Sequence, residues 1–521
     1  SGCGKSTLLK LIKREISPYG ELNGSILFNG ENIKDISDRE SACKIGYVMQ
    51  NPDSQIVTDK VWHELAFGLE SMGLSNDVIR RRVAENASYF GIEDWYYKNT
   101  DELSGGQKQI LNLASVMAMQ PDVLLLDEPC SQLDPNAATS FISTLKKLNE
   151  EFGITVIIAE HRLEEIFDFA DKLVFMDSGE IKFCDKPHNA LEFLGSGDYS
   201  DMVTALPCPV RILNALGCNE ANKATAKACR RYITDNFDNK IKSLPQKEFT
   251  HKDEIAVEFK NVWFRYEKDT PDIAKGISFK IYENECFTIL GGNGTGKTTA
   301  LNLIADILKP YRGEIFVLGK KLKSYENNSL YKNCLTLLSQ NPQNVFLEDT
   351  LENDFSEVCK AMGYKKDEAK TEIDKITKKL SISHLLSSHP YDLSGGEQQK
   401  AALAKVLLLK PKILLLDEPS KGIDAFSKKT LCSIIEELKA EGITVITVTH
   451  DIEFASLISD RCALYFDGGL ISCDIPQRFF SSNSFYTTVA NRITRGYFDN
   501  TVTCDDVVAL CFENKRRSNE Q

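Results

Sequence analysis

A glycine-rich segment that ends in lysine and threonine is the clearest place for chemistry in this chain. It follows the apolar run 286–290, precedes a helix-like run at 300–304, and consists of Gly291, Gly292, Asn293, Gly294, Thr295, Gly296, Lys297, Thr298 and Thr299. Glycines let the backbone turn tightly, so that successive N–H groups can surround phosphate oxygens at a helix N-terminus. The spacing G-x-x-x-x-G-K-[ST] predicts that Lys297 reaches the β- and γ-phosphates and that the Thr298 hydroxyl binds Mg²⁺.

The same pattern stands at the start of the sequence, in Ser1, Gly2, Cys3, Gly4, Lys5, Ser6 and Thr7. Ser1 aligns with Asn293, so the first glycine of the motif and the strand before it have no counterpart. By the length of the later copy, about 38 residues would precede Ser1. We therefore expect the sequence to be a fragment whose first nucleotide site is incomplete.

Paired carboxylates end two apolar runs. Asp127 and Glu128 follow the run 123–126, and Asp417 and Glu418 follow the run 413–416. The first carboxylate of each pair can complete the Mg²⁺ shell, and the second can orient or deprotonate an attacking water. An Asp-Glu pair alone is usually a polar strand end, but a phosphate loop upstream favours catalysis.

Single histidines and glutamines recur beside these pairs. His161 and His450 each follow the next apolar strand, where a doubly wound sheet brings side chains to the phosphate loop. They are predicted to bond the γ-phosphate. Gln50 and Gln340 each precede Asn-Pro and are predicted to join the Mg²⁺ or water shell.

A serine and two glycines open a helix in each half of the chain. The two segments are Ser104, Gly105, Gly106 and Gln107, and Ser394, Gly395, Gly396 and Glu397. Such a helix start can bind an anion, yet each half already has a phosphate loop. A second phosphate site in each half implies a second nucleotide-facing surface.

These motifs occur twice in the same order, about 290 residues apart, so the chain is predicted to be a tandem repeat of one α/β domain. The runs 123–126, 154–159 and 173–176 are expected to be strands buried in a parallel sheet, with a helical lobe that includes 77–90. The predicted divisions are domain 1 at 1–194, a helical extension and linker at 195–254, domain 2 at 255–483, and a helical tail at 484–521.

Composition excludes several classes of protein. The net charge of −13 argues against broad nucleic-acid binding, which needs concentrated Lys and Arg. Fifteen cysteines without a C-x-x-C pair make a zinc site improbable and suggest reduced thiols in a cytosolic compartment. No apolar run is long enough to span a bilayer, so a soluble or peripheral protein is expected.

Each half of the chain contains, in this order, a phosphate loop, a glutamine segment, a serine-glycine segment, a carboxylate pair and a histidine. This arrangement, present twice, resembles tandem ATP-binding cassette (ABC) ATPase domains. In that family two domains pair head to tail. The resemblance therefore implies that 394–397 close over ATP held by Gly2, Gly4, Lys5 and Ser6, and that 104–107 close over ATP held by 291–299. It also implies that Tyr266 stacks on adenine. Because Glu397 replaces the usual glutamine, we expect two competent sites of unequal rate.

The segments 50–55, 61–68 and 340–346 are similar to the ATPase components of energy-coupling factor importers, which take up vitamins or metal ions. This resemblance implies two partners, an integral-membrane coupling protein and a small substrate-binding membrane protein, at the cytoplasmic face of the membrane. Glu64 and Asp354 are candidates for pairing with an arginine of the coupling protein, weighed against solvated helix charges.

Two other classes stay open. A tandem sugar-importer ATPase has the same layout. A ribosome-associated ABC-F translation factor would be expected to carry a longer charged linker and a basic surface, which the near-neutral linker and the net charge speak against.

Overall fold

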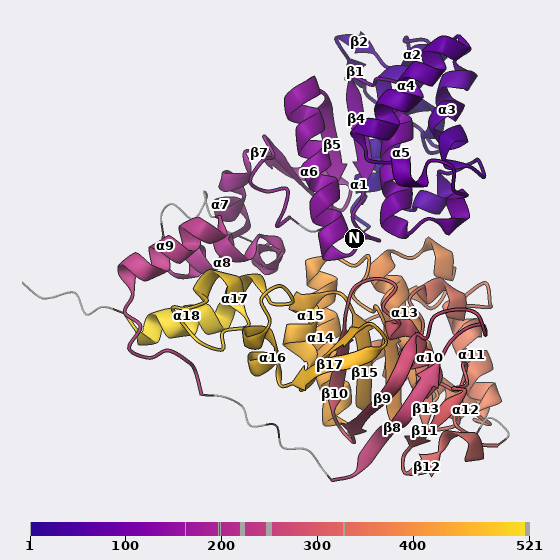
Figure 1. Cartoon of the computed structure of the whole chain (residues 1–521), viewed down its shortest axis with the longest axis vertical. Coiled ribbons are helices and arrows are strands. Elements are labelled where there is room, and N and C mark those ends of the chain that lie inside the picture. The colour runs from indigo at the N-terminus through magenta and orange to yellow at the C-terminus, as the bar shows by residue number, and fades with distance from the viewer. Residues whose placement is uncertain are drawn as a thin grey trace, which may run out of the picture. The chain divides into compact units, whose positions relative to one another are not determined.

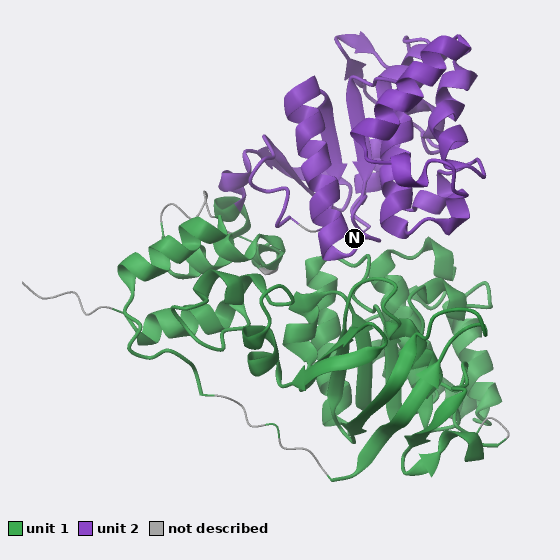
Figure 2. Ribbon diagram, in the orientation of Figure 1, with its two compact units in different colours: residues 1, 191–521 green, residues 2–190 purple. Residues whose placement is uncertain are grey.

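The computed structural model describes residues 2–161, 163–195, 197, 199–218, 225–245, 249, 253–326 and 329–515. They form two compact units, residues 2–190 and the larger unit from residue 191 onward (Figure 2). Each unit carries one copy of the predicted repeat. Within the described ranges no helix is long and apolar enough to cross a membrane.

The larger unit contains the complete α/β domain. Its central sheet has the order β13-β14-β15-β10-β16-β17, in which all neighbours are parallel except β16 and β17. Its strands are β10 (Cys286–Leu290), β13 (Leu335–Leu338), β14 (Ile413–Asp417), β15 (Thr444–Thr449), β16 (Arg461–Phe466) and β17 (Gly469–Asp474). β10, β14 and β15 are buried throughout, as expected for continuous apolar runs covered on both faces.

A second, antiparallel sheet and a set of helices complete this domain (Figure 1). The antiparallel sheet has the order β12-β11-β8-β9. Its strands are β8 (Ile255–Phe264), β9 (Ala274–Tyr282), β11 (Arg312–Val317) and β12 (Lys320–Lys321). The helices are α10 (Lys297–Ile304), α11 (Leu351–Ala361), α12 (Lys366–Lys379), α13 (Gly395–Leu407), α14 (Ala425–Ala440), α15 (Ile452–Ile458) and α16 (Pro476–Ser482).

The smaller unit repeats part of the core, with smaller sheets. Its strands are β1 (Leu27–Phe28), β2 (Glu31–Asn32), β3 (Ile45–Val48), β4 (Val123–Asp127), β5 (Thr155–Ala159), β6 (Leu173–Asp177) and β7 (Glu180–Asp185). Its helices are α1 (Lys5–Ile12), α2 (Asp38–Lys44), α3 (Val61–Ser71), α4 (Asn76–Tyr89), α5 (Gly105–Ala118) and α6 (Pro135–Phe152). β3, β4 and β5 are parallel, whereas β6 and β7 form a separate antiparallel pair.

The predicted strand at 173–176 is present as β6, but in this copy it pairs with β7 rather than with the parallel strands. In the larger unit β10 lies between β15 and β16 and joins them, but residues 2–190 contain no strand in the corresponding position. Ile157 of β5 and Val174 of β6 are consequently exposed by 38% and 46%. Ser1 aligns with Asn293, which follows β10, so the counterpart of β10 is not among residues 2–190.

A helical lobe joins chain segments from both ends of the larger unit. α8 (Cys208–Ala215) packs on α18 (Cys504–Glu513), and α9 (Ala226–Asn236) packs on α17 (Val489–Thr494) (Figure 1). The thiols of Cys208 and Cys504 lie 2.9 Å apart inside it. The helices that follow the first copy in sequence thus pack against the C-terminal helices, α17 and α18.

Candidate active sites at the two glycine loops

The glycine loop of the larger unit connects β10 to α10 as predicted. Gly294 and Gly296 have φ of 74° and 105°, in the left-handed region that favours glycine. A Cβ on Gly296 would also lie 2.6 Å from a side-chain carbon of Ile273. Lys297 Nζ donates to the carbonyl oxygens of Gly291 and Gly292 at 2.9 and 2.8 Å. The lysine cation is thus held directly over the loop.

The predicted metal ligands meet beside this loop. Thr298 Oγ1 donates to Asp417 Oδ1 at 3.1 Å, and Ser6 Oγ donates to Asp127 Oδ1 at 2.8 Å in the smaller unit. A hydroxyl and a carboxylate are oxygen ligands of the kind that Mg²⁺ prefers. Burial raises the pKa of Asp417 to about 6, because no cation compensates this carboxylate fully. The ligand types and the uncompensated charge both fit Mg²⁺.

The catalytic candidates Glu418 and His450 are in contact. A ring nitrogen of His450 lies 2.9 Å from Glu418 Oε2, which also accepts from the His450 N–H at 3.2 Å. The Thr449 hydroxyl donates to the same oxygen at 3.0 Å. Burial alone would raise the pKa of Glu418, but the bonds from His450 and the charge of Lys297 outweigh it, so the pKa lies below its ordinary value. The carboxylate is kept ionised, as a general base requires.

The smaller unit brings the equivalent residues together with different partners. Gln50 Nε2 donates to Glu128 Oε2 at 2.8 Å, and His161 Nε2 lies 2.7 Å from Glu128 Oε1. Burial acts to raise the pKa of Glu128, yet His161 and then Lys5 hold it below its ordinary value. In this copy the predicted glutamine thus contacts the predicted general base. Gln50 and Gln340 are both exposed, after β3 and β13 respectively.

The sheet explains why these residues meet. In the smaller unit Gln50, Asp127 and His161 stand at the carboxyl ends of the neighbouring strands β3, β4 and β5. In the larger unit Asp417, His450 and Gly291 stand at the carboxyl ends of β14, β15 and β10. Parallel neighbours bring these ends to one edge.

The positions of the remaining predicted residues are as follows, and their roles stay predictions. Ser104 and Ser394 are the N-caps of α5 and α13, so Gly105, Gly106, Gly395 and Gly396 form the first turns of these helices. Ser394 Oγ donates to Glu397 Oε2 at 2.6 Å. Tyr266 is 60% exposed, and its hydroxyl lies 3.0 Å from Thr299 Oγ1. Ser1 lies outside the described residues.

Glu64 and Asp354 do not match either expectation for them, because both are buried. Glu64 is 4% exposed and accepts from the N–H groups of Val57 and Thr58. Asp354 is 1% exposed, accepts from the Leu347 N–H at 3.1 Å, and pairs with Lys405 Nζ at 2.8 Å. Each carboxylate bonds the turn after the glutamine segment to the helix that follows it, α3 in the smaller unit and α11 in the larger unit. They are neither solvated charges nor available to an arginine of a partner.

Sequence reasoning missed other residues of the two sites. Tyr47 of β3 donates to Asp127 Oδ2 at 3.1 Å, whereas Leu337 stands at the equivalent position in β13. Glu160 precedes His161 and binds two backbone N–H groups. A comparison of the two copies position by position would have marked both residues as differences beside the motifs.

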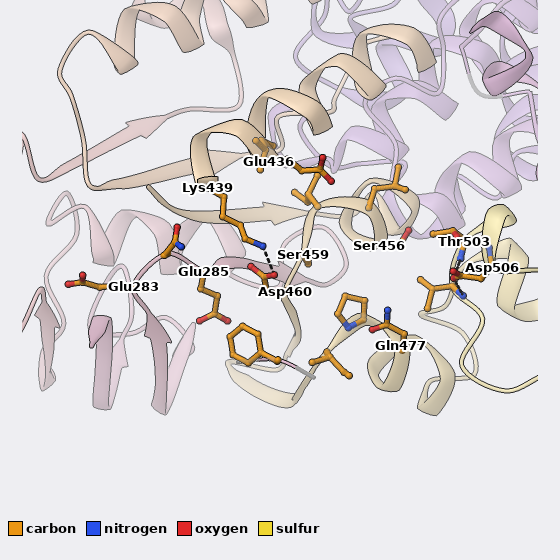
Figure 3. Close-up of a pocket in the computed structure, with 18 residues that line it drawn as sticks. Glu283, Glu285, Glu436, Lys439, Ser456, Ser459, Asp460, Gln477, Thr503 and Asp506 are labelled. Carbon is orange, nitrogen blue, oxygen red and sulfur yellow. Dashed lines mark hydrogen bonds and ion pairs between the residues drawn. The ribbon is translucent and has the colours of Figure 1, made fainter. Parts of the chain in front are cut away.

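A separate cavity of about 650 Å³ lies at the opposite edge of the larger unit's sheet. Glu285 and Asp460 line it just before β10 and β16, so it faces the amino ends of these strands (Figure 3). Its acidic groups are largely engaged, Asp460 by Lys439 at 2.6 Å and Glu285 by Arg461 at 2.6 Å. This cavity is distinct from the glycine-loop site.

Comparison with known proteins agrees with the geometry. The family model described as ABC transporter matches residues 1–131 and 274–421. An ABC transporter ATP-binding protein of Bacillus thuringiensis is 37% identical over 512 residues, which cover 98% of this chain and 92% of the relative. One from Clostridium tetani is 34% identical over 430 residues, 82% of this chain and 95% of the relative.

Among solved structures, cbiO1 of Clostridium perfringens, part of the ABC transporter complex cbiONQ, is 30% identical. The similarity covers 44% of this chain and 91% of cbiO1, with a TM-score of 0.41. The matches to the family model and to full-length relatives, together with the paired site residues, show that this chain belongs to the ABC transporter family and is an ATPase with two ATP-binding cassettes in tandem.

Proposed function

We propose that this chain is the ATP-hydrolysing subunit of an energy-coupling factor importer for a vitamin or a metal ion, acting at the cytoplasmic face of the membrane. The observation that carries this proposal is the surface that follows the first glutamine segment. There Val57 is 63% exposed, and Trp62 and Phe67 of α3 are 40% and 45% exposed. Apolar side chains grouped in sequence at a surface favour contact with a partner.

The two copies differ at this surface. Trp62 and Phe67 correspond to Glu352 and Glu357 of α11, both exposed. Leu347, the counterpart of Val57, is exposed by 85%, so both surfaces keep an apolar residue in the turn and differ in the residues of the helix. Helix surfaces that are apolar in one copy and acidic in the other suit a partner that presents two different segments. A single coupling protein in the membrane has this property, because two of its helices would meet two unlike surfaces.

Each cassette uses its own residues for the chemistry. Glu128 and Glu418 orient and deprotonate the attacking water, and the histidine beside each holds that carboxylate and binds the γ-phosphate. Asp127 with Ser6, and Asp417 with Thr298, would hold Mg²⁺, which when bound neutralises charge that develops on the phosphates. Lys5 and Lys297 bind the β- and γ-phosphates.

We further propose that the cassettes pair within one chain. The serine-glycine segment 394–397 would then complete the site of Lys5, and segment 104–107 the site of Lys297. Contacts made only in the closed state let ATP favour closure, and hydrolysis removes them. The motion between closed and open states would then be passed to the membrane partner.

Affinity purification of the full-length protein from its own membranes in mild detergent tests this function. Mass spectrometry should identify one coupling protein and one small substrate-binding membrane protein. Recovery of ribosomal proteins from the soluble fraction would instead support a translation factor, and a pair of large permeases would support a sugar importer.

A surface variant locates the contact. Trp62→Glu/Phe67→Glu gives α3 the residue types of α11 and should reduce recovery of the coupling protein at least about fivefold, because an apolar contact is lost. Phe152→Glu, at the exposed end of α6, is the matched control. Equal recovery with both variants would remove α3 from the interface.

A further inference from the structure

The two cassettes fasten the histidine segment with different carboxylates. In the smaller unit Glu160 stands immediately before His161, and in the larger unit Asp451 stands immediately after His450. Glu160 Oε1 accepts from the Cys130 N–H at 2.8 Å, and Glu160 Oε2 from the His161 N–H at 3.1 Å. One side chain therefore links two segments 30 residues apart in sequence.

Asp451 makes the corresponding link in the larger unit. Its Oδ2 accepts from the Ser420 hydroxyl at 3.1 Å and from Lys428 Nζ at 2.5 Å. Ser420 and Cys130 are equivalent, since each follows the Glu-Pro pair that comes directly after β14 or β4. Both copies thus connect the same two segments. The carboxylate precedes the histidine in the smaller unit and follows it in the larger unit.

This exchange changes what holds the general base. In the larger unit Thr449 occupies the position of Glu160, and its hydroxyl and the His450 N–H both donate to Glu418. In the smaller unit the His161 N–H donates to Glu160 instead, and both carboxylate oxygens of Glu160 accept from backbone N–H groups rather than contacting Glu128. Glu128 is held by side chains, from Gln50 and His161.

We propose that Glu160 is a positioning residue of the first ATP site, which fixes the histidine segment and leaves Glu128 dependent on Gln50. The inference rests on the proposed roles of Glu128 and His161. In the second site the strand residue Thr449 and the backbone of His450 fix Glu418 without the glutamine. A movement of the turn between β3 and α3 would therefore displace Glu128 through Gln50. A movement of the equivalent turn after β13 would leave Glu418 in place.

The experiment confines hydrolysis to the first site with Glu418→Gln in the full-length protein. In this background Glu160→Gln should lower kcat about tenfold and change KM for ATP less than twofold, because one carboxamide oxygen cannot accept both N–H groups as well. An unchanged kcat would overturn the proposal. Unchanged ATP affinity and melting temperature exclude loss of folding as the cause.

A double-mutant cycle separates positioning from a structural role. Gln50→Ala should lower kcat about tenfold in the Glu160 enzyme and less than threefold in the Glu160→Thr variant, whose hydroxyl can hold Glu128 as Thr449 holds Glu418. Equal losses in both would contradict the dependence of Glu128 on Gln50.

Two outcomes distinguish the assignment of the general bases from the positioning role of Glu160. If Glu128→Gln/Glu418→Gln still hydrolyses ATP at the wild-type rate, the assigned bases are wrong and the proposal for Glu160 has no basis. If that double variant is inactive and Glu160→Gln is fully active, the bases stand and the positioning role alone is excluded.

Discussion

At the scale of residues, the two glutamates proposed as general bases share an uncommon backbone conformation. Glu128 and Glu418 have φ of 45° and 49°, in the left-handed region, and each precedes a proline. Such a conformation costs on the order of 1 kcal/mol or more and persists only where the surroundings impose it. Here the Glu128 N–H donates to the Ala159 carbonyl and the Glu418 N–H to the Val448 carbonyl, both at 2.9 Å. The turn directs each carboxylate toward its histidine.

The buried pair of Asp354 and Lys405 gives a residue-scale prediction. Lys405→Met would leave the Asp354 carboxylate buried without its cation, so the free energy of unfolding should fall by about 3 kcal/mol. Adding Asp354→Asn should recover part of this loss, because the buried charge is then removed. Calorimetry of the three proteins measures both effects. A Lys405→Met protein as stable as wild type would show that the pair contributes nothing.

At the scale of elements, parallel strands and the loops after them account for what could be predicted. The runs 123–126 and 413–416 and the loop 291–296 are local patterns, so β4, β14 and the phosphate loop follow from them directly. The burial of Glu64 and Asp354 could not be predicted, because an acidic residue in the first turn of a helix is ordinarily solvated. Their backbone partners lie in a turn whose path the sequence pattern does not define.

The pairing of β6 reflects the part of the first copy that is present, because Ser1 aligns with Asn293, which follows β10. The apolar run of β6 has the same pattern as β16, yet β6 pairs only with β7 while β16 also pairs with β10. Strand pattern predicts that a segment forms a strand, but membership of a sheet depends on which neighbour is present. Tyr47 and Glu160 each belong to one copy alone, so the motifs shared by both copies do not include them, whereas a position-by-position comparison of the copies does mark them.

The helical lobe gives an element-scale prediction. Asn514 is 4% exposed and exchanges two hydrogen bonds with the backbone of Ile241, both at 2.8 Å. Asn514→Ala would remove both of these partly buried hydrogen bonds, at a cost of about 1 kcal/mol each. Limited proteolysis should then cleave near residue 241 at least several times faster. Asn236→Ala, which removes one local bond on the exposed end of α9, is the control and should not change the rate.

Cleavage that is equally slow in the Asn514→Ala and Asn236→Ala proteins would show that Asn514 does not hold the linker to α18. Because α8 and α9 share a core with α17 and α18, the lobe connects segments that flank the second cassette in sequence. The linker is thus part of a folded element over residues 237–242, rather than a free tether.

At the scale of the whole molecule, the account requires each serine-glycine segment to act on the nucleotide of the other cassette. With Glu128→Gln, hydrolysis is confined to the loop of Lys297. Ser104→Arg should then abolish the remaining turnover, because a bulky cation replaces a γ-phosphate donor, while Ser394→Arg should leave at least about half of it. Steady-state phosphate release measures both. The opposite pattern would show that each cassette uses its own segment.

The most direct test of the account is the ATP turnover of Glu128→Gln, Glu418→Gln and the double variant, measured at saturating Mg²⁺ and ATP. Each single variant should retain turnover from the other site, and the double variant should fall by about 10²-fold or more while it still binds ATP. A double variant that binds ATP and turns it over at the wild-type rate would contradict the assignment of both catalytic sites.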